Sequence, residues 1–419
     1  MRALLYAPDL QGHPQIYCRV IAGALLRAGH TVVIASPSAK EDWRTAWPPL
    51  RPLADDSRVE CEDVRAQSAA PGGGLTAEQL LAIQTRRRVD STLFIEGDKF
   101  AEQFRRIAAG DAPRPRGRIC AICDRAAAWY PGEDPYDGRR EPRIGPTWRA
   151  TLSRIRRGLL HRRQTARHYY EQVLLRRRTV DALIVKDERI AERFGPPVTW
   201  MPEIYRVFDP RPDERRGPDW ERFADPIRAF VDRAGAGNVL LYFGAGAWYK
   251  GYDAFLRLAI ADETTFALHA GAPPRHEPGK NYDLDVAAAR QDLLRQGRWF
   301  ETGAFVESTD LVELLFASIA RFVSTHRLTL TSGTMLQALE QEKPVLTPDA
   351  GLVGWRTRTF QLGSVYRYGD PTALRDAWRS FRTGAFDPPV ESLRRFMRKF
   401  SRSETERFFV GVLTGDRPP

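Results

Sequence analysis

Apolar runs typical of buried strands alternate with stretches whose apolar residues recur at helical spacing in the first part of the chain. Residues 2–8 form an apolar run, residues 14–29 carry the helical pattern, and residues 30–36 form a β-branched run. Gly29 stands at the position of a helix C-cap. This order predicts a strand–helix–strand unit, which is the opening of an open parallel α/β sheet.

Further apolar runs extend this sheet. Residues 91–97, 117–124 and 181–187 are predicted as strands, and each ends with an acidic residue at or near its last position. Ligands of open parallel sheets bind beyond the carboxyl ends of the strands, so these ends are candidate site positions. Residues 147–178 are predicted as one or two helices with an arginine-rich face.

A domain boundary is expected where the pattern breaks. Residues 194–220 are dense in Pro and Gly and lack periodicity, and the α/β alternation restarts after them. We predict four segments: an N-terminal domain 1–205, a linker 206–235, a C-terminal domain 236–385, and a C-terminal helix with tail 386–419. Two such domains would face each other across a cleft formed by two sets of strand ends.

The stretch YFGAGAWYKGYDAFLRLA, residues 242–259, reads as a strand, a glycine-bearing turn and a helix. Backbone N–H groups at such a turn attract phosphate, and Lys250 would add a point charge. The residue order is neither a P-loop nor a G-x-G-x-x-G motif. An ordinary tight turn with a solvated lysine is the alternative interpretation.

A second candidate phosphate site lies where Thr331, Ser332, Gly333 and Thr334 lead into a predicted helix. Ser332 or Thr331 could cap this helix, and Gly333 would let a ligand approach its free N–H groups. Plain N-capping is the structural alternative. Two candidate phosphate sites in one domain support a diphosphate ligand more strongly than either site does alone.

The net charge and the lengths of the apolar runs restrict the class of protein but do not identify its function. The net charge is +11, which favours polyanionic partners, although an arginine bias of the genome would produce the same balance. No run approaches the ~18 apolar residues of a membrane span, and the N-terminal run is too short for a signal peptide. We therefore expect a soluble, cytoplasmic protein.

The cysteines point to a reducing compartment. Cys120 and Cys123 form a C-x-x-C inside a predicted strand, and neither Cys18 nor Cys61 provides a second pair at zinc spacing. Buried thiols are the expected state, with a redox or metal pair as the alternative.

Taken together, these stretches resemble GT-B-fold glycosyltransferases, nearest to the retaining family-4 type and related bacterial polysaccharide enzymes. Residues 180–210 are similar to the family's last N-domain strand and hinge, residues 239–259 to its first C-domain strand and K-G turn, and residues 332–354 to its donor-binding helix. The resemblance implies two Rossmann-like open parallel-sheet domains facing a cleft, with the C-terminal helix returning to the N-terminal domain.

The resemblance also implies donor-binding residues. Lys250 stands at the lysine that contacts the donor's diphosphate, in the turn that holds Gly244 and Gly246. The family's companion arginine falls on Ala245, and Thr302 opens the TGAF stretch where the family's backbone reads the nucleobase.

The family's pair of glutamates falls on Thr329 and Gln337, so both carboxylates are absent. Gln337 could still hydrogen-bond a ribose or sugar hydroxyl. Ser332 and Thr334, with Gly333 between them, could replace phosphate contacts. These departures leave the retaining or inverting outcome open.

Acceptor and catalytic candidates lie at the predicted strand ends of the N-terminal domain. Gly12 is a candidate acceptor-binding residue, and the catalytic candidates are His13, Glu96 and Asp124. An inverting enzyme needs one general base to deprotonate the acceptor hydroxyl, and any of the three would suffice. Glu203 is interpreted as a structural contact at the hinge.

The expected activity is transfer of a sugar from a nucleotide diphosphate sugar to a hydroxyl acceptor in bacterial glycan or glycosylated-metabolite synthesis. No cofactor and no metal are expected beyond the donor itself. The acceptor could be lipid-linked, and the basic segment at residues 147–178 could rest on an anionic membrane as a peripheral contact.

Two alternatives remain. The first is a nucleotide-sugar epimerase on the same fold. The second is a non-catalytic polyanion-binding protein, although no nucleic-acid module is visible and aromatic residues are not interleaved with the basic runs.

Overall fold

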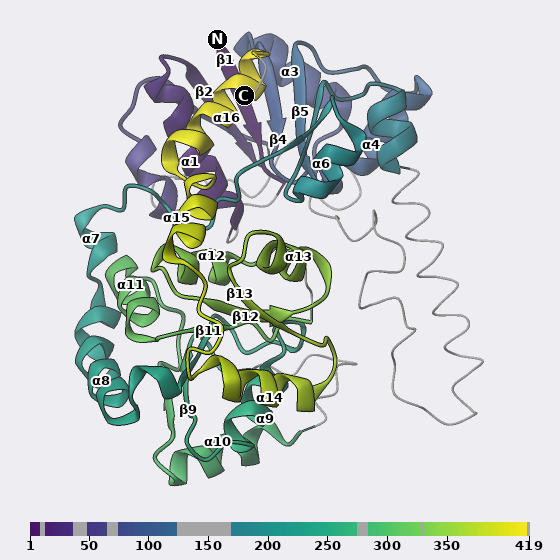
Figure 1. Cartoon of the computed structure of the whole chain (residues 1–419). Helices are drawn as coiled ribbons and strands as arrows, with labels where there is room; N and C mark the ends of the chain where they lie inside the picture. Colours follow the sequence, from purple (N-terminus) through teal and green to yellow (C-terminus); the bar gives the residue numbers. More distant parts are fainter. Residues whose placement is uncertain are drawn as a thin grey trace. The chain divides into compact units, whose positions relative to one another are not determined.

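The structure, a computed structural model, describes residues 1–8, 13–36, 48–64, 74–123, 169–274, 284–327 and 331–416 (Figure 1). Contacts divide the described residues into two units. Unit 1 holds those between Met1 and Phe208 together with those from Phe400 onward, and unit 2 holds Asp209–Lys399. The predicted boundary between the N-terminal domain and the linker, at residue 205, falls close to Phe208.

The described part of unit 1 contains a seven-stranded sheet in the order β3-β2-β1-β4-β5-β6-β7, with every pairing parallel. Its strands are β1 (Arg2–Tyr6), β2 (Thr31–Ser36), β3 (Val59–Asp63), β4 (Ser91–Phe94), β5 (Arg118–Cys123), β6 (Ala182–Val185) and β7 (Val198–Trp200). The central strands are continuous apolar runs because helices cover both faces of a parallel sheet. The predicted open parallel α/β fold is confirmed.

Helices of unit 1 connect these strands. They are α1 (His13–Arg27), η1 (Pro48–Leu53), α3 (Ala77–Arg87), η3 (Gly97–Phe100), α4 (Ala101–Ala109), η6 (Tyr169–Arg176) and α6 (Glu188–Phe194). Thr76 and Gln79 form a capping box at the start of α3, each side chain bonding the other's backbone N–H. Of the predicted helical segment 147–178, residues 147–168 lie outside the described residues.

The C-terminal helix α16 (Arg402–Thr414) belongs to unit 1, where the yellow ribbon runs beside purple α1 in Figure 1. Phe408, Phe409, Val412 and Leu413 enter the core that α1 and the central strands form. An ion pair between Arg27 and Glu406 at 2.7 Å borders this contact. The expected return of the C-terminal helix to the N-terminal domain is confirmed.

The C-x-x-C lies within β5. Since successive side chains of a strand alternate between its faces, Cys120 and Cys123 point to opposite faces of the sheet. Both thiols are buried and neither forms a disulfide, and burial raises the pKa of Cys120 to about 12. The geometry gives these two residues a packing role.

Unit 2 repeats the alternation of strands and helices. Its described strands form two parallel three-stranded ladders, β10-β9-β8 and β11-β12-β13. They are β8 (Val239–Phe243), β9 (Phe266–Ala270), β10 (Trp299–Glu301), β11 (Phe322–Val323), β12 (Val345–Pro348) and β13 (Gly363–Tyr366). Strands β8 and β11 are neighbours, so the two ladders meet there.

The segment predicted as a linker, residues 206–235, is mostly helical and contains α7 (Pro212–Arg215) and α8 (Pro218–Ala234). Phe223, Ile227 and Phe230 form the buried stripe of α8. Pro226 lies inside this helix, and a proline in a helix interior argues against a helix when the sequence is taken alone.

The other helices of unit 2 are η7 (Ala236–Asn238), η8 (Trp248–Lys250), α9 (Tyr252–Ile260), α10 (Val286–Arg295), α11 (Thr309–Ser318), α12 (Gly333–Glu340), α13 (Gly351–Thr359), α14 (Pro371–Phe381) and α15 (Val390–Arg398). None of the helices in the described ranges is long and apolar enough to cross a bilayer.

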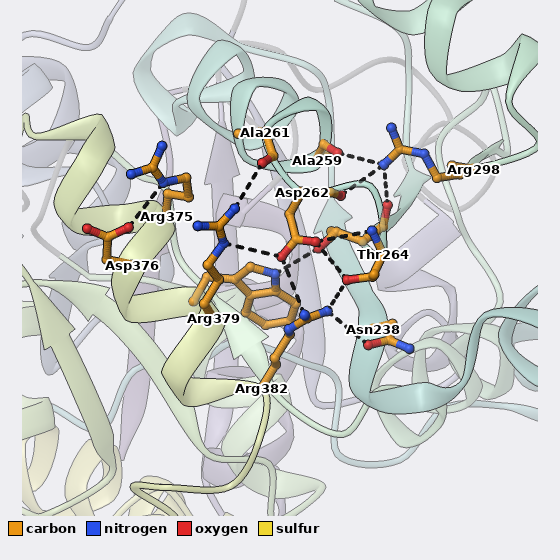
Figure 2. Close-up of polar contacts among 12 residues, drawn as sticks. Asn238, Ala259, Ala261, Asp262, Thr264, Arg298, Arg375, Asp376, Arg379 and Arg382 are labelled. Carbon is orange, nitrogen blue, oxygen red and sulfur yellow. Dashed lines mark hydrogen bonds and ion pairs between the residues drawn. The ribbon is translucent and has the colours of Figure 1, made fainter.

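A polar cluster fastens the C-terminal end of α9 (Figure 2). Arg298 donates through one guanidinium nitrogen to the carbonyls of Ala259, Asp262 and Thr265 at 2.8, 3.0 and 2.8 Å. The buried Asp262 carboxylate lies 3.6 Å from the Arg382 guanidinium. Because helix ends leave carbonyls without intrahelical partners, one arginine satisfies this end from outside the helix.

Candidate functional site

A glycine-bearing turn follows β8, which ends at Phe243. Gly244 has a φ of +103° there. A Cβ on Gly271 would lie 2.1 Å from the Gly244 carbonyl oxygen, and one on Gly246 would lie 2.9 Å from the Pro274 backbone nitrogen. The chain after β8 and the chain after β9 therefore meet backbone to backbone, which only glycine allows. A role of these glycines toward a ligand stays a prediction.

Lys250, the last residue of η8, turns back over this loop. Its Nζ would lie 2.5 Å from a Cβ at Gly244, so the ammonium rests against the bare Cα. Burial lowers the pKa of Lys250. Among the described residues no hydrogen bond or carboxylate partner reaches Nζ, and its recorded contact is the ring of Tyr249 at 6.0 Å. A half-buried cation without a counter-charge favours an anionic ligand.

The end of β11 holds the lysine turn in place. Thr325 Oγ1 donates to the Lys250 carbonyl at 3.0 Å, and a Cβ on Gly251 would lie 1.9 Å from the Thr325 carbonyl oxygen. Arg327 then forms two parallel hydrogen bonds of 2.7 Å with the buried carboxylate of Asp253, in the first turn of α9. This bidentate pair ties together two segments distant in sequence.

His269 on β9 supports the turn from below. Its Nε2 lies 3.1 Å from the Gly244 carbonyl oxygen, and its Nδ1 lies 3.3 Å from the Tyr252 hydroxyl. A carbonyl only accepts, so Nε2 carries the proton and Nδ1 accepts from the tyrosine. Burial, with smaller effects from the Arg290 and Lys250 cations, lowers the pKa of His269 to about 4. The ring is neutral at pH 7.

His326 lies beside the same turn, between Thr325 and Arg327. Its Nδ1 is 3.1 Å from the hydroxyl of buried Ser324. Burial and the nearby Lys250 ammonium lower the pKa of His326 to about 3. The carboxyl ends of β8, β9 and β11 thus bring one lysine and two neutral histidines together.

The predicted helix cap at α12 is present. Ser332 Oγ accepts from the Met335 backbone N–H at 3.2 Å and lies 2.9 Å from the Thr334 hydroxyl. Gly333 is the first residue of the helix. The hydroxyl of Ser332 is therefore occupied as a cap. A phosphate contact of Ser332, Gly333 or Thr334 stays a prediction.

Two other donor-site candidates have different surroundings. Thr302 is buried, and its hydroxyl accepts from the Gly271 N–H at 2.9 Å and donates to the Ala304 carbonyl at 3.1 Å. That side chain shapes the loop after β10. Gln337 is half-buried on α12, and its amide has no recorded partner among the described residues.

The candidates of the N-terminal domain are only partly described. Gly12 and Asp124 lie outside the described residues, and His13 is described as the first residue of α1 without its side chain. Glu96 follows β4 and pairs with Lys99 at 2.8 Å. Glu203, predicted at the hinge, is buried within unit 1 after β7. A catalytic role of His13, Glu96 or Asp124 stays a prediction.

The sequence did not single out His269, His326 or Arg327. A histidine within an apolar strand and a His-Arg pair directly after another strand were the available signals. Their roles depend on contacts with Gly244, Lys250 and Asp253, which lie far away along the chain. No group of three or more metal-ligating side chains is found within the described ranges.

Comparison with known proteins identifies the fold. No family model and no curated protein sequence matches the chain. The solved structure of HepE from Anabaena in complex with UDP is similar, with a TM-score of 0.61 and 12% identity, over 99% of this chain and 100% of that one. Sucrose-phosphate synthase from Thermosynechococcus elongatus gives a TM-score of 0.58 and 14% identity, over 99% and 98%.

A protein described as a UDP-N-acetylglucosamine 2-epimerase from Listeria monocytogenes is also similar, with a TM-score of 0.50 and 10% identity, over 100% of this chain and 98% of that one. Identities this low establish the fold alone. The chain has the GT-B fold of glycosyltransferases, as the sequence led us to expect.

Proposed function

We propose that this protein is a glycosyltransferase that moves a sugar from a nucleotide diphosphate sugar to a hydroxyl acceptor, in bacterial glycan or glycosylated-metabolite synthesis. The donor would bind unit 2, and the acceptor would bind unit 1. The fold supports this reading, since the similar structures include a sucrose-phosphate synthase and a HepE structure with UDP.

The observation that carries the proposal is the ammonium of Lys250. It lies at the carboxyl end of a parallel strand, is half-buried against Gly244, and has no carboxylate partner in the described ranges. Open α/β sheets bind ligands at this edge. A diphosphate would supply the missing charge, and the ammonium would offset charge on the departing diphosphate during transfer.

The next requirement of the reaction is removal of the acceptor's proton, which we assign to unit 1. We propose a metal-independent reaction in which a carboxylate or histidine of unit 1, from among His13, Glu96 and Asp124, receives the acceptor's proton if the reaction inverts configuration. Gly12 would line the acceptor side. Ser332 to Thr334 and Gln337 would contact the donor.

The test is a thermal-shift and calorimetric titration with UDP, GDP, ADP, dTDP and CMP. We expect one diphosphate to stabilise the protein selectively, and Lys250→Ala to weaken its affinity about 10- to 100-fold, because a hydrogen bond to a charged group contributes about 1.5–3 kcal/mol. Unchanged affinity in Lys250→Ala would remove the donor site proposed here.

Lys343→Ala is the matched control. It removes the same charge, and Lys343 lies at the amino end of β12, where its Nζ donates to the Ala317 carbonyl at 2.9 Å. We expect its nucleotide affinity to equal that of the wild type. An equal loss in both variants would indicate general electrostatic attraction of polyanions, the alternative that the positive net charge favours.

An epimerase is the second candidate, because the similar structures include one described as a UDP-N-acetylglucosamine 2-epimerase. Product analysis separates the two. A transferase leaves the sugar unchanged until an acceptor is added, whereas an epimerase converts the nucleotide sugar without one.

A further inference from the structure

The backbone around His326 is fixed to the lysine turn on both sides. The Thr325 hydroxyl donates to the Lys250 carbonyl at 3.0 Å, and the Arg327 N–H donates to the Tyr249 carbonyl at 2.9 Å. His326 stands between these two contacts. Its position relative to Lys250 is therefore set by hydrogen bonds and does not depend on the path of its own side chain.

Ser324 determines which ring nitrogen of His326 carries the proton. The Ser324 hydroxyl is buried, and the one acceptor recorded for it among the described residues is His326 Nδ1 at 3.1 Å. We take the hydroxyl to donate its hydrogen to this one acceptor, because a buried polar hydrogen is rarely left without a partner. Nδ1 therefore accepts, and the proton of the neutral ring sits on Nε2. No partner for Nε2 is recorded in the part of the chain that the structure describes.

Among the described residues, Lys250 is the charged group that acts on this ring. Lys250 faces it from η8, and Arg327 follows it with its charge paired to Asp253 of α9. Burial and the Lys250 ammonium lower the pKa of His326 to about 3, so the ring stays neutral in the physiological range. Beside the ammonium there is thus a neutral N–H donor for which the described residues offer no acceptor.

We propose that His326 donates through Nε2 to the same phosphate group that Lys250 binds, as a second and uncharged phosphate ligand. The inference rests on the proposed function, because it takes the anion to be the donor's diphosphate. The ammonium would supply charge, and the imidazole would supply direction, since its N–H is held in one orientation by Ser324. Ala245, at the start of the same turn, contributes no side-chain donor.

The test compares His326→Phe with His326→Gln. Phenylalanine keeps the ring and removes the donor, whereas the glutamine amide nitrogen can occupy the place of Nε2. The probes are inorganic pyrophosphate, which carries the diphosphate without a base, and UDP. By calorimetry we expect His326→Phe to bind both probes about 10- to 100-fold more weakly, as for one hydrogen bond to a charged group. His326→Gln should stay within about twofold of the wild type.

Ser324→Ala is the second variant, and His30→Gln, in unit 1, is the control. Without the serine hydroxyl the proton can occupy either ring nitrogen, so we expect Ser324→Ala to weaken binding of both probes about two- to threefold at unchanged thermal midpoint. Nitrogen-15 NMR of histidine-labelled protein should show the Nε2-protonated neutral form of His326 between pH 6 and 8. His30→Gln should bind as the wild type does.

The outcomes separate the two proposals. If the wild type binds neither pyrophosphate nor any nucleoside diphosphate, both fail. If the wild type binds and His326→Phe binds equally well, the histidine is not a ligand and the donor site stands. If phenylalanine and glutamine variants lose stability alike while affinity is unchanged, His326 is a packing residue and the inference is overturned.

Discussion

Gly251 shows how single residues set the geometry of the lysine turn. It joins η8 to α9 at a φ of +67°, and a Cβ there would lie 1.9 Å from the Thr325 carbonyl oxygen. Two separate requirements fall on this position. The backbone needs a conformation that side chains disfavour, and the neighbouring strand end leaves no room for any side chain.

Gly251→Ala should therefore displace the lysine turn from the end of β11. We expect a loss of stability well above the ~1 kcal/mol that alanine costs at a left-handed position alone, together with weaker nucleotide binding. Gly29→Ala is the matched control, because Gly29 has a φ of +79° and no atom within 4 Å of an added Cβ. Equal thermal midpoints of the two variants would contradict the close approach.

His269 makes stability depend on pH in a defined direction. Its pKa is about 4 in the folded protein, below the ~6.5 of an unfolded chain, so between these values the unfolded state binds more protons. Stability is then fully present above pH 6.5 and falls as the pH drops toward 4. At pH 5 the loss from this residue is roughly 2 kcal/mol.

The measurement is urea unfolding of the wild type and His269→Gln at pH 7.5 and pH 5. We expect the variant to be less stable at pH 7.5, because the bond to the Gly244 carbonyl is altered, but to lose less stability on acidification. Identical losses in the two proteins would show that His269 is not the group that titrates.

At the scale of elements, Arg298 acts on the end of a helix. Of the three carbonyls that it satisfies, that of Ala259 lies in the last turn of α9, and those of Asp262 and Thr265 lie in the chain between α9 and β9. The lysine turn lies at the N-terminal end of the same helix. A substitution at the C-terminal end of α9 should therefore change the stability of the protein without changing nucleotide binding at the N-terminal end.

We expect Arg298→Met to lower the free energy of unfolding by at least about 1–3 kcal/mol, because the Ala259 carbonyl at the end of α9 loses its donor, whereas the Asp262 carbonyl keeps the Thr265 N–H. Nucleotide affinity should change little. Arg295→Met is the control, since the Arg295 side chain is 74% exposed and should change stability by less than ~0.5 kcal/mol. A large loss of nucleotide affinity in Arg298→Met would contradict the separation of the two ends.

Across the whole molecule, the last helix completes the core of the first unit. Phe409 on α16 is fully buried there, and α16 also accepts from Arg118 through the Val412 carbonyl at 2.5 Å. The core of unit 1 therefore depends on a segment that follows unit 2 along the chain.

Phe409→Ala should destabilise unit 1 by about 3–5 kcal/mol, as for other phenylalanines replaced in well-packed cores. Hydrogen exchange followed by mass spectrometry should show faster exchange in β1, β4 and α1 and unchanged exchange in unit 2. Phe386→Ala is the control, since that side chain is 57% exposed and its removal should have no such effect. Faster exchange in unit 2 alone would refute the claim that α16 stabilises unit 1.

Local patterns in the sequence were sufficient to predict much of this molecule. The apolar runs at β1, β2, β4, β5, β6 and β8 were recognisable because a parallel strand covered on both faces must be apolar along its length. Ser332 was recognisable as a cap because that contact spans three residues. β3, β7 and β13 were not identified, and Pro226 concealed α8.

The tertiary structure decided the candidate site. Lys250 was visible in the sequence, but its lack of a carboxylate partner in the described ranges was not. The pairing of Arg327 with Asp253 and the bond of His269 to Gly244 join segments that only folding brings together. Local propensity acts over a few residues along the chain, whereas burial, charge compensation and the protonation of a ring nitrogen depend on neighbours in space.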